Sequence, residues 1–187
     1  MTETIISILL GFGLAASAGF RVFVPLFALS LATHYGYVPV GDSFTWIGGL
    51  PAIICLGIAT VVEIGAYYIP FVDNLLDTIS IPLATIAGSV VMASTLMDLD
   101  PMLTWGLAII AGGGTAAAIT TSTAAARATS TATTGGLGNN IVSSTETATA
   151  SFVSILAIFA PIIAFIVVLL IIFVGIKMFK KVFSSGK

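Results

Sequence analysis

The sequence has few charged residues, and this shortage decides its class. Charged side chains make up only 7% of the 187 residues, and 58% of the residues are hydrophobic. A soluble domain carries about 25% charged residues, so this chain cannot cover a water-facing surface of ordinary composition. Lipid must therefore be its solvent, and only helices or closed barrels satisfy their backbone there. The composition predicts an all-α polytopic transmembrane helical bundle that forms a single domain over residues 1–187.

Cysteine and histidine each occur once, as Cys55 and His34. One cysteine excludes a disulfide or a thiolate metal site within the chain, and we expect Cys55 to be a buried structural thiol. A lone imidazole is a weak metal signal. The sequence therefore predicts no metal site and no cofactor.

Catalytic and nucleic-acid-binding patterns are also missing. There is no Walker motif, no dinucleotide fingerprint and no His/Cys cluster, and a serine–histidine pair would have to use His34 near a loop. The formal net charge of −2 and the scattered basic residues exclude a nucleic-acid partner. A two-aspartate protease would need facing carboxylates at depth, whereas the candidates occupy predicted boundary or loop positions: Asp73, Asp77, Asp98 and Asp100. We expect that the protein is not an enzyme.

Apolar runs separated by breakers predict about five membrane spans. These cover residues 4–33, 49–69, 80–97, 102–127 and 151–178, with short amphipathic or re-entrant helices at 71–79 and 141–150 and a kink at Pro161. Small residues at helical spacing predict close contacts between spans; they are Gly11, Ala15 and Gly19 in the first span and Ala84, Gly88 and Ala93 in the third.

A run of alanine, serine and threonine from residue 115 to residue 134 follows the apolar part of the fourth span. Between two membrane spans this composition favours a central buried helix, whose hydroxyls bond back to helix carbonyls or line a wet path. Residues 135–140, GGLGNN, end the helix. The small-residue faces favour a homo-oligomer or contact with other membrane subunits, and they serve packing within one chain equally well.

Ionisable groups inside apolar segments are expensive and are functional candidates. Arg21 either snorkels to the interface from a tilted helix or turns inward to a carboxylate. Glu63 lies within the second span, and Tyr67, one turn later, can offer its hydroxyl to that carboxyl. Pro70, Asn74 and Asp77 continue the helix face on which Glu63 lies, and together they predict a polar seam. The candidate substrate or ion pathway consists of Arg21, Glu63, Tyr67, Asp73, Asp77, Arg127 and Glu146.

Two pairs of segments are alike and raise the question of an internal repeat. Residues 17–21 resemble residues 123–127, since each is a small-residue helix that ends in arginine; residues 70–78 resemble 139–147. With three crossings between the two arginines, the halves would be inverted, as in many transporters. Chance similarity between segments rich in small residues is the alternative.

Three stretches together resemble a family of uncharacterised integral membrane proteins, domain of unknown function 4126. They are GLAASAGFRVFVPLFALSLA, EIGAYYIPFVDNLLDTISIPLATIAG, and the small-residue helix with arginine before a final span that bears glutamate. The resemblance is most specific at Arg21, Pro25, Glu63, Ile69-Pro70, Val72-Asp73, Asp77 and Pro82-Leu83-Ala84. The Tyr67-Tyr68 pair departs from the Asp-Lys pair that is usual in the family. The resemblance implies a membrane domain and supplies no activity.

Two functions fit these features. One is a small transporter or channel for a solute or ion, with Glu63 as a proton or cation site and the arginines as its counter-charges or as receptors for an anion. The other is a non-catalytic membrane subunit in which the same charges are structural pairs. Lysines 177, 180, 181 and 187 follow the last span and predict a multi-pass protein of the cell membrane with a cytoplasmic C-terminus.

Overall fold

All regular structure in the described part of the chain is helical. The structure, a computed structural model, describes the backbone of residues 2–184 and the side chains in that range other than those of residues 70, 71, 74 and 178–184. The elements are α1 (Thr2–Ala18), α2 (Phe23–His34), the 3-10 helix η1 (Asp42–Gly48), α3 (Leu50–Ala66), α4 (Pro70–Thr95), α5 (Pro101–Leu107), the π-helical segment η2 (Ala108–Gly113), α6 (Gly114–Thr134), α7 (Asn139–Phe159) and α8 (Pro161–Ser184).

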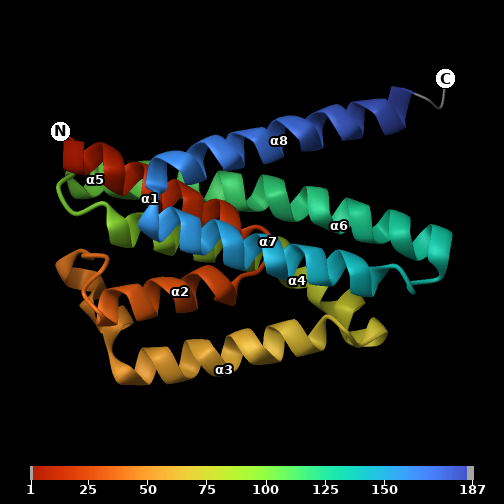
Figure 1. The fold of residues 1–187 in the computed structure, drawn as a ribbon, viewed down its shortest axis with the longest axis horizontal. Helices are drawn as coiled ribbons and strands as arrows, with labels where there is room; N and C mark the ends of the chain where they lie inside the picture. Colours follow the sequence, from red (N-terminus) through yellow and green to blue (C-terminus); the bar gives the residue numbers. More distant parts are fainter. Residues whose placement is uncertain (1, 185–187) are drawn as a thin grey trace.

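The first two helices form a hairpin inside the bundle. In Figure 1, α1 runs from the N-terminal end of the molecule to its middle, and α2 returns from there to the same end. The prediction of one span over residues 4–33 is therefore wrong. The break at residues 19–22 persists because a side chain from α3 satisfies the free backbone donors at the start of α2, as described below. Pro25 stands in the first turn of α2, where a missing N–H costs nothing.

The remaining helices run back and forth along the long axis of the molecule (Figure 1). Within the described residues, three stretches are long and apolar enough to cross a membrane, namely Leu75–Thr95, Pro101–Thr134 and Asn139–Phe159. A fourth results if η1 and α3, which meet at 64°, form one broken span, and Pro161–Lys177 is a shorter apolar helix. The apolar helices indicate a multi-pass membrane protein, with three to four candidate spans where the sequence predicted about five.

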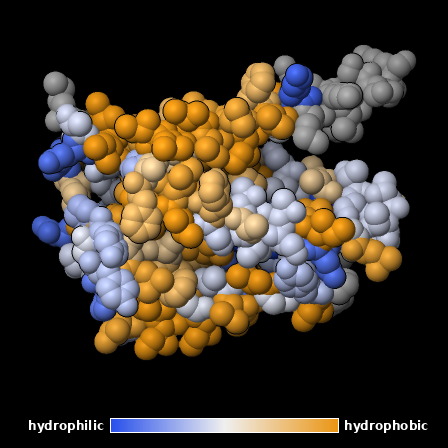
Figure 2. All heavy atoms as spheres, in the orientation of Figure 1, coloured by the Kyte–Doolittle hydropathy of each residue, from blue (hydrophilic) through white to orange (hydrophobic). Residues whose placement is uncertain are grey.

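The surface has the distribution of polarity that such a protein needs. Figure 2 shows apolar residues over α8 and over the opposite edge at α3, with hydrophilic residues gathered toward the ends of the long axis. Exposed aromatic residues include Tyr35, Tyr37 and Trp46 in and near the predicted interfacial loop. Cys55 is exposed on α3, so the expectation of a buried thiol is wrong.

Pro82 and Pro161 have different effects on the chain, and neither effect is the one predicted from the sequence. The predicted segments 71–79 and 80–97 form one helix, α4, that continues through Pro82. Packing against α1, η2 and α6 holds this helix together. At Pro161, in contrast, the chain reverses, because the residue before a proline disfavours helical geometry and proline suits a first helical turn. The predicted unit 151–178 is therefore two antiparallel helices, and the predicted segment 141–150 belongs to α7.

Helix α6 is not the central buried helix that its composition suggested. It continues the α5–η2 helix seven residues past the predicted end at Arg127, and its buried residues are Ala116, Ile119, Thr120 and Arg127. Its hydroxyls do bond back to the helix, as Thr121 Oγ1 does to the Ala117 carbonyl at 2.7 Å. Gly135 and Gly136, with φ of 62° and 91°, end α6 as expected from GGLGNN.

The segments matched in the repeat are not inverted. Figure 1 shows α1 and α6, which carry the first matched pair, running in the same direction. The same holds for α4 and α7, which carry the second pair. The count of three crossings failed because α2 returns to its starting end and adds one reversal.

Small residues bring the helices into close contact, as predicted for Gly11, Gly19, Ala84 and Gly88. A Cβ atom added at Gly11 or Gly19 would collide with α4 or α6, respectively. The approach of Gly88 to η2 involves backbone, since its Cβ would lie 2.8 Å from the Gly112 carbonyl oxygen.

We expect Gly88→Ala to destabilise the bundle by about 1–3 kcal/mol, because backbone must move to admit the methyl group. Gly106 is the matched control, since a Cβ there meets nothing within 4 Å; Gly106→Ala should stabilise by about 1 kcal/mol through helix propensity. Thermal unfolding in detergent measures both. Equal melting temperatures for the two variants would contradict the close approach of α4 and η2.

Candidate functional site

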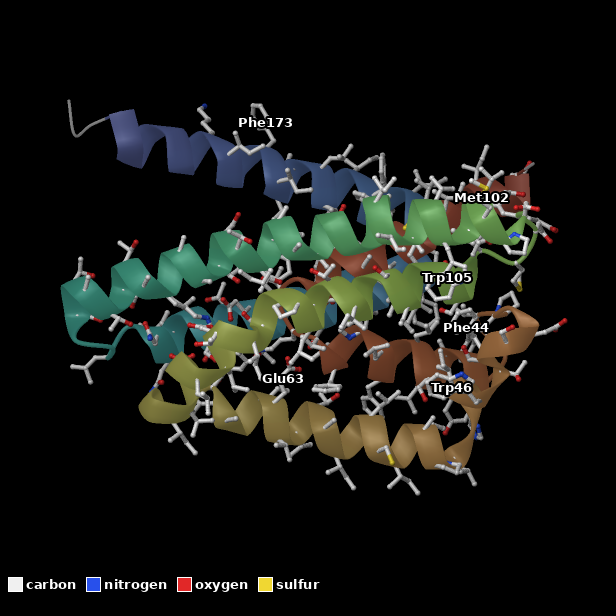
Figure 3. The ribbon with its side chains drawn as sticks, turned by 180° about the vertical axis from the view of Figure 1, so that it is seen from behind. Phe44, Trp46, Glu63, Met102, Trp105 and Phe173 are labelled. Carbon is white, nitrogen blue, oxygen red and sulfur yellow. The ribbon has the colours of Figure 1, made fainter. Side chains whose placement is uncertain are left out.

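The seven predicted pathway residues come together in one group, called here the charged cluster. Its members are Arg21 at the α1–α2 break, Glu63 and Tyr67 at the end of α3, Asp73 and Asp77 at the start of α4, Arg127 in α6, and Glu146 in α7. Figure 3 shows Glu63 on the α3 face that is turned toward the other helices. Pro70 and Asn74, predicted on the same polar face, lie outside the described side chains.

Arg127 is the centre of the charged cluster. Its side chain is buried, its Nη1 bonds Asp73 Oδ1, and its Nη2 bonds Glu146 Oε2. Its Nε donates to Glu146 Oε1 at 3.1 Å, and Asp77 Oδ1 lies 3.8 Å from Nη1. The planar guanidinium thus uses its fork to bind one carboxylate with two nitrogens and a second with one. Asp73 is 1% exposed and lies two residues before the candidate span that begins at Leu75, so its predicted boundary position stays a prediction.

Arg21 turns inward, and the snorkelling alternative is excluded because only 1% of the residue is exposed. Its Nη2 donates to the Ser143 carbonyl at 2.9 Å and to the Ser143 hydroxyl at 2.5 Å. Its Nε donates to Thr147 Oγ1 at 3.0 Å. Nη1 forms an ion pair with Glu146 Oε2 at 3.3 Å without hydrogen-bond geometry. Glu146 is therefore shared by both arginines.

Tyr67 contacts both guanidinium groups. Arg21 Cζ is 4.0 Å and Arg127 Cζ is 4.1 Å from the centre of its ring. Each arginine therefore gains a cation–π contact with the same ring. The predicted hydrogen bond from its hydroxyl to Glu63 is not found among the described side chains.

Glu63 instead caps helix α2. Its Oε1 accepts the Val22 N–H at 2.8 Å, and its Oε2 accepts the Phe23 N–H at 3.0 Å. The first N–H groups of a helix have no partner within it, and the positive end of its dipole favours a carboxylate. Because the α2 terminus is inside the bundle, this cap is what permits the hairpin to turn there.

The charged cluster has more carboxylates than arginines. Glu63, Asp73, Asp77 and Glu146 face only two guanidinium groups, so two acids lack a counter-charge if all of them ionise. Neutrality therefore requires bound protons or a bound cation.

Two hollows meet at Asp77. A cavity of about 10 Å³, near the size that admits one water, is lined by Glu63, Tyr67, Asp77 and Arg127 together with small residues of α1, α4 and α6. A wider groove of about 440 Å³ is lined by Asp77 of α4 and by Ala124, Ala128, Thr131 and Ala132 of α6. Asp77 lines both, and 23% of its side chain is exposed. It connects the charged cluster to the groove; of these two hollows, Glu63 lines the small cavity.

Sequence reasoning missed the polar residues of α7 that support the charged cluster. Asn139 Nδ2 donates to Asp73 Oδ2 at 2.9 Å and to Thr131 Oγ1 at 3.0 Å, and Ser143 and Thr147 bind Arg21. A signal was present, because Asn139, Ser143 and Glu146 recur at helical spacing on one face. The described side chains contain no group of three or more His, Cys, Asp or Glu residues placed to hold a metal ion.

The comparisons with known proteins give one match. A family model described as Domain of unknown function (DUF4126) matches residues 8–181. No curated protein and no solved structure matches the chain.

Proposed function

Since the chain belongs to the DUF4126 family, whose description assigns no activity, we propose a function from the geometry of the charged cluster. The protein is a small membrane transporter or channel, and the charged cluster exchanges a proton or small cation with the groove. It is not an enzyme, and its surroundings are the lipid bilayer of the cell membrane.

The surplus of carboxylates is the observation that carries this proposal. A buried carboxylate needs a basic partner, hydrogen-bond donors or a bound proton, because an unpaired buried charge is costly. Here Asp73, Asp77 and Glu146 share Arg21 and Arg127, and Glu63 has backbone N–H groups as its partners, so three carboxylates share two guanidinium groups. The excess negative charge gives the cluster an affinity for a proton or cation whose release and rebinding move positive charge.

Asp77 is a better exchange group than Glu63, the residue expected from the sequence. Both oxygens of Glu63 already accept backbone N–H groups. Asp77 is the most weakly held by Arg127, at 3.8 Å, and it is reached from the groove. When Asp77 takes up a positive charge, Arg127 can remain paired with Asp73 and Glu146, so occupancy changes without breaking the centre of the cluster.

Reconstituted protein tests the role of Asp77. In proteoliposomes with an imposed potential, wild-type protein should carry protons or monovalent cations, measured with an internal pH dye and with ⁸⁶Rb⁺. Asp77→Asn should reduce the flux to that of protein-free liposomes, because within the described residues it removes the one carboxylate that lines both cavity and groove.

Asp98→Asn is the control, since Asp98 is an exposed acid in the α4–α5 loop and its loss should leave flux unchanged. Wild-type flux in the Asp77→Asn protein would refute the assignment of Asp77 as the exchange group.

A second function, a non-catalytic subunit of a larger membrane complex, is favoured by the same ion pairs. These ion pairs join the hairpin tip, α4, α6 and α7, and the cation–π contacts of Tyr67 add the end of α3. Contacts of this kind hold helices together without any transport role. Purification from native membranes with a stoichiometric partner, together with no flux by the isolated protein, would support this function over transport.

The proposed orientation places the C-terminus in the cytoplasm. Four lysines follow the apolar part of α8, and lysine-rich flanks stay on the cytoplasmic side. Of these residues, Lys177 has a described side chain, and it is exposed. The test is whether a C-terminal tag is protected from protease added to intact cells. Cleavage of the tag would show that the C-terminus lies outside the cell and would contradict the proposed orientation.

A further inference from the structure

The groove beside the charged cluster has the form of a small-molecule site. Its wall on α6 consists of Ala124, Ala128, Thr131 and Ala132, which recur at the spacing of one helix face. Asp77 of α4 closes the side nearest the cluster. The volume of about 440 Å³ is far larger than a metal ion needs and falls within the range of ligand pockets.

We propose that this groove binds a small organic monocation, an amine whose ammonium group pairs with Asp77 and whose short apolar body lies along the alanines of α6. This inference deepens the proposed function, on which it rests, by naming the class of substrate. An amine in this position supplies the positive charge that the surplus carboxylates lack.

Charge selects a cation for the groove over a neutral or anionic ligand. Among the described side chains that line it, Asp77 is the only ionisable group, and of the three carboxylates paired with an arginine Asp77 is the one held at the longest distance. Asp73 and Glu146 bond directly to Arg127 and stand behind it. A ligand ammonium therefore approaches a carboxylate that has free acceptor capacity, in surroundings with net negative charge.

A second observation joins the groove wall to the charged cluster through Asn139. Asn139 is 7% exposed, and within the described part of the chain its Oδ1 has no hydrogen-bond partner. Its Nδ2 is already committed to Asp73 and to Thr131, a residue of the groove wall. Asn139 therefore holds Thr131 of the groove wall next to Asp73 of the charged cluster, and a positive charge bound in the groove lies close to the surplus carboxylates.

The walls define what the rest of the ligand is. Three of the four α6 residues are alanines, and the fourth is a threonine. Methyl surfaces of this kind favour a short aliphatic chain and offer little to a ligand with several polar groups. An inorganic ion would leave the groove unfilled.

Binding to purified protein tests the inference without any flux measurement. The probes are butylammonium, butanol and butyrate, which share a chain length and differ in head-group charge, titrated into the full chain in detergent by calorimetry. We expect saturable binding of butylammonium and none of butanol or butyrate. Asp77→Asn should weaken butylammonium binding at least about tenfold, as expected for loss of a charged partner.

A second variant separates the groove from the charge. Ala128→Leu fills the groove from an exposed position of α6, and Ala126→Leu adds the same side chain at another exposed position, away from the groove wall. Ala128→Leu should weaken butylammonium binding by a similar factor, while Ala126→Leu should leave it unchanged. Equal binding of butylammonium and butanol, or equal binding by both leucine variants, would overturn the proposal.

Flux and binding can fail separately. Binding of butylammonium without any flux would refute transport and keep the groove as a site for amines. Proton or Rb⁺ flux that needs Asp77, without butylammonium binding, would refute the amine site and keep the proposed function.

Discussion

Replacing Arg127 with methionine is expected to destabilise the bundle strongly. The guanidinium is 3% exposed and holds Asp73 and Glu146 directly. Methionine has a similar length but no charge, so the variant leaves these buried carboxylates with Arg21 as the one remaining guanidinium. Removing one partner of a buried ion pair costs about 3–5 kcal/mol, a large part of the 5–15 kcal/mol or so that stabilises a typical protein.

The measurement is the thermal loss of helical ellipticity in detergent, together with gel filtration for monodispersity. At this chain length, a decrease of about 3–5 kcal/mol in the free energy of unfolding lowers the melting temperature by about 10 °C or more. Lys177→Met is the matched control, since Lys177 is exposed and should melt as wild type does.

Arg127→Lys is expected to lie between wild type and Arg127→Met, because an ammonium keeps the charge but lacks the planar fork that grips two carboxylates. If Arg127→Met melted with the Lys177→Met control, the ion pairs would contribute nothing and the centre of the charged cluster would be misplaced.

The membership of the charged cluster could be predicted from sequence because charge is so scarce in this chain. An arginine or acid inside an apolar run has few stable places, and mutual pairing is the commonest. The inward alternative for Arg21 followed from this argument. The pairing itself could not be predicted, since Arg21 reaches Glu146 across 125 positions of the chain and only the fold brings them together.

The hairpin of α1 and α2 shows why the first span was mistaken. Residues 4–33 exceed the 20 or so residues that a span needs, and this excess was the available signal. The break, however, is stabilised by Glu63, a residue 40 positions from Phe23. The local sequence contains the apolar run. It does not contain the information that a distant carboxylate accepts the backbone N–H groups where the helix is interrupted.

Pro82 and Pro161 illustrate the same limit. Both are prolines in apolar helical sequence, yet α4 continues through Pro82 and the chain reverses at Pro161. Pro82 is itself exposed, but Ala84 and Ala87, which follow it in α4, are buried against α1 and α6, and this packing offsets the cost of the missing hydrogen bond. Tertiary packing, which local propensity does not contain, decides between a helix that continues and one that ends.

Removing the cap of α2 should have the second large effect. Glu63→Ala leaves the N–H groups of Val22 and Phe23 without acceptors. Each buried unsatisfied group costs about 1–3 kcal/mol, so the two together cost about 2–6 kcal/mol. The damage should begin at the hairpin tip, because α4, α6 and α7 keep their own ion pairs through Arg127.

Amide hydrogen exchange distinguishes this loss of the cap from general destabilisation. In Glu63→Ala, the amides of Val22 and Phe23 should exchange much faster than in wild type, while protection in the middle of α4 persists. Glu63→Gln, whose side-chain carbonyl can still accept one of the two N–H bonds, should retain part of the protection. Glu3→Ala, at an exposed position of α1, should retain all of it.

Unchanged protection at Val22 and Phe23 in Glu63→Ala would show that another group satisfies the α2 terminus. Glu63 would then not be needed as a cap, and it would again be a candidate, as predicted from the sequence, for a buried carboxylate that exchanges a proton. Loss of protection would confine that role to Asp77. The cap therefore determines how many of the four carboxylates are available to carry charge.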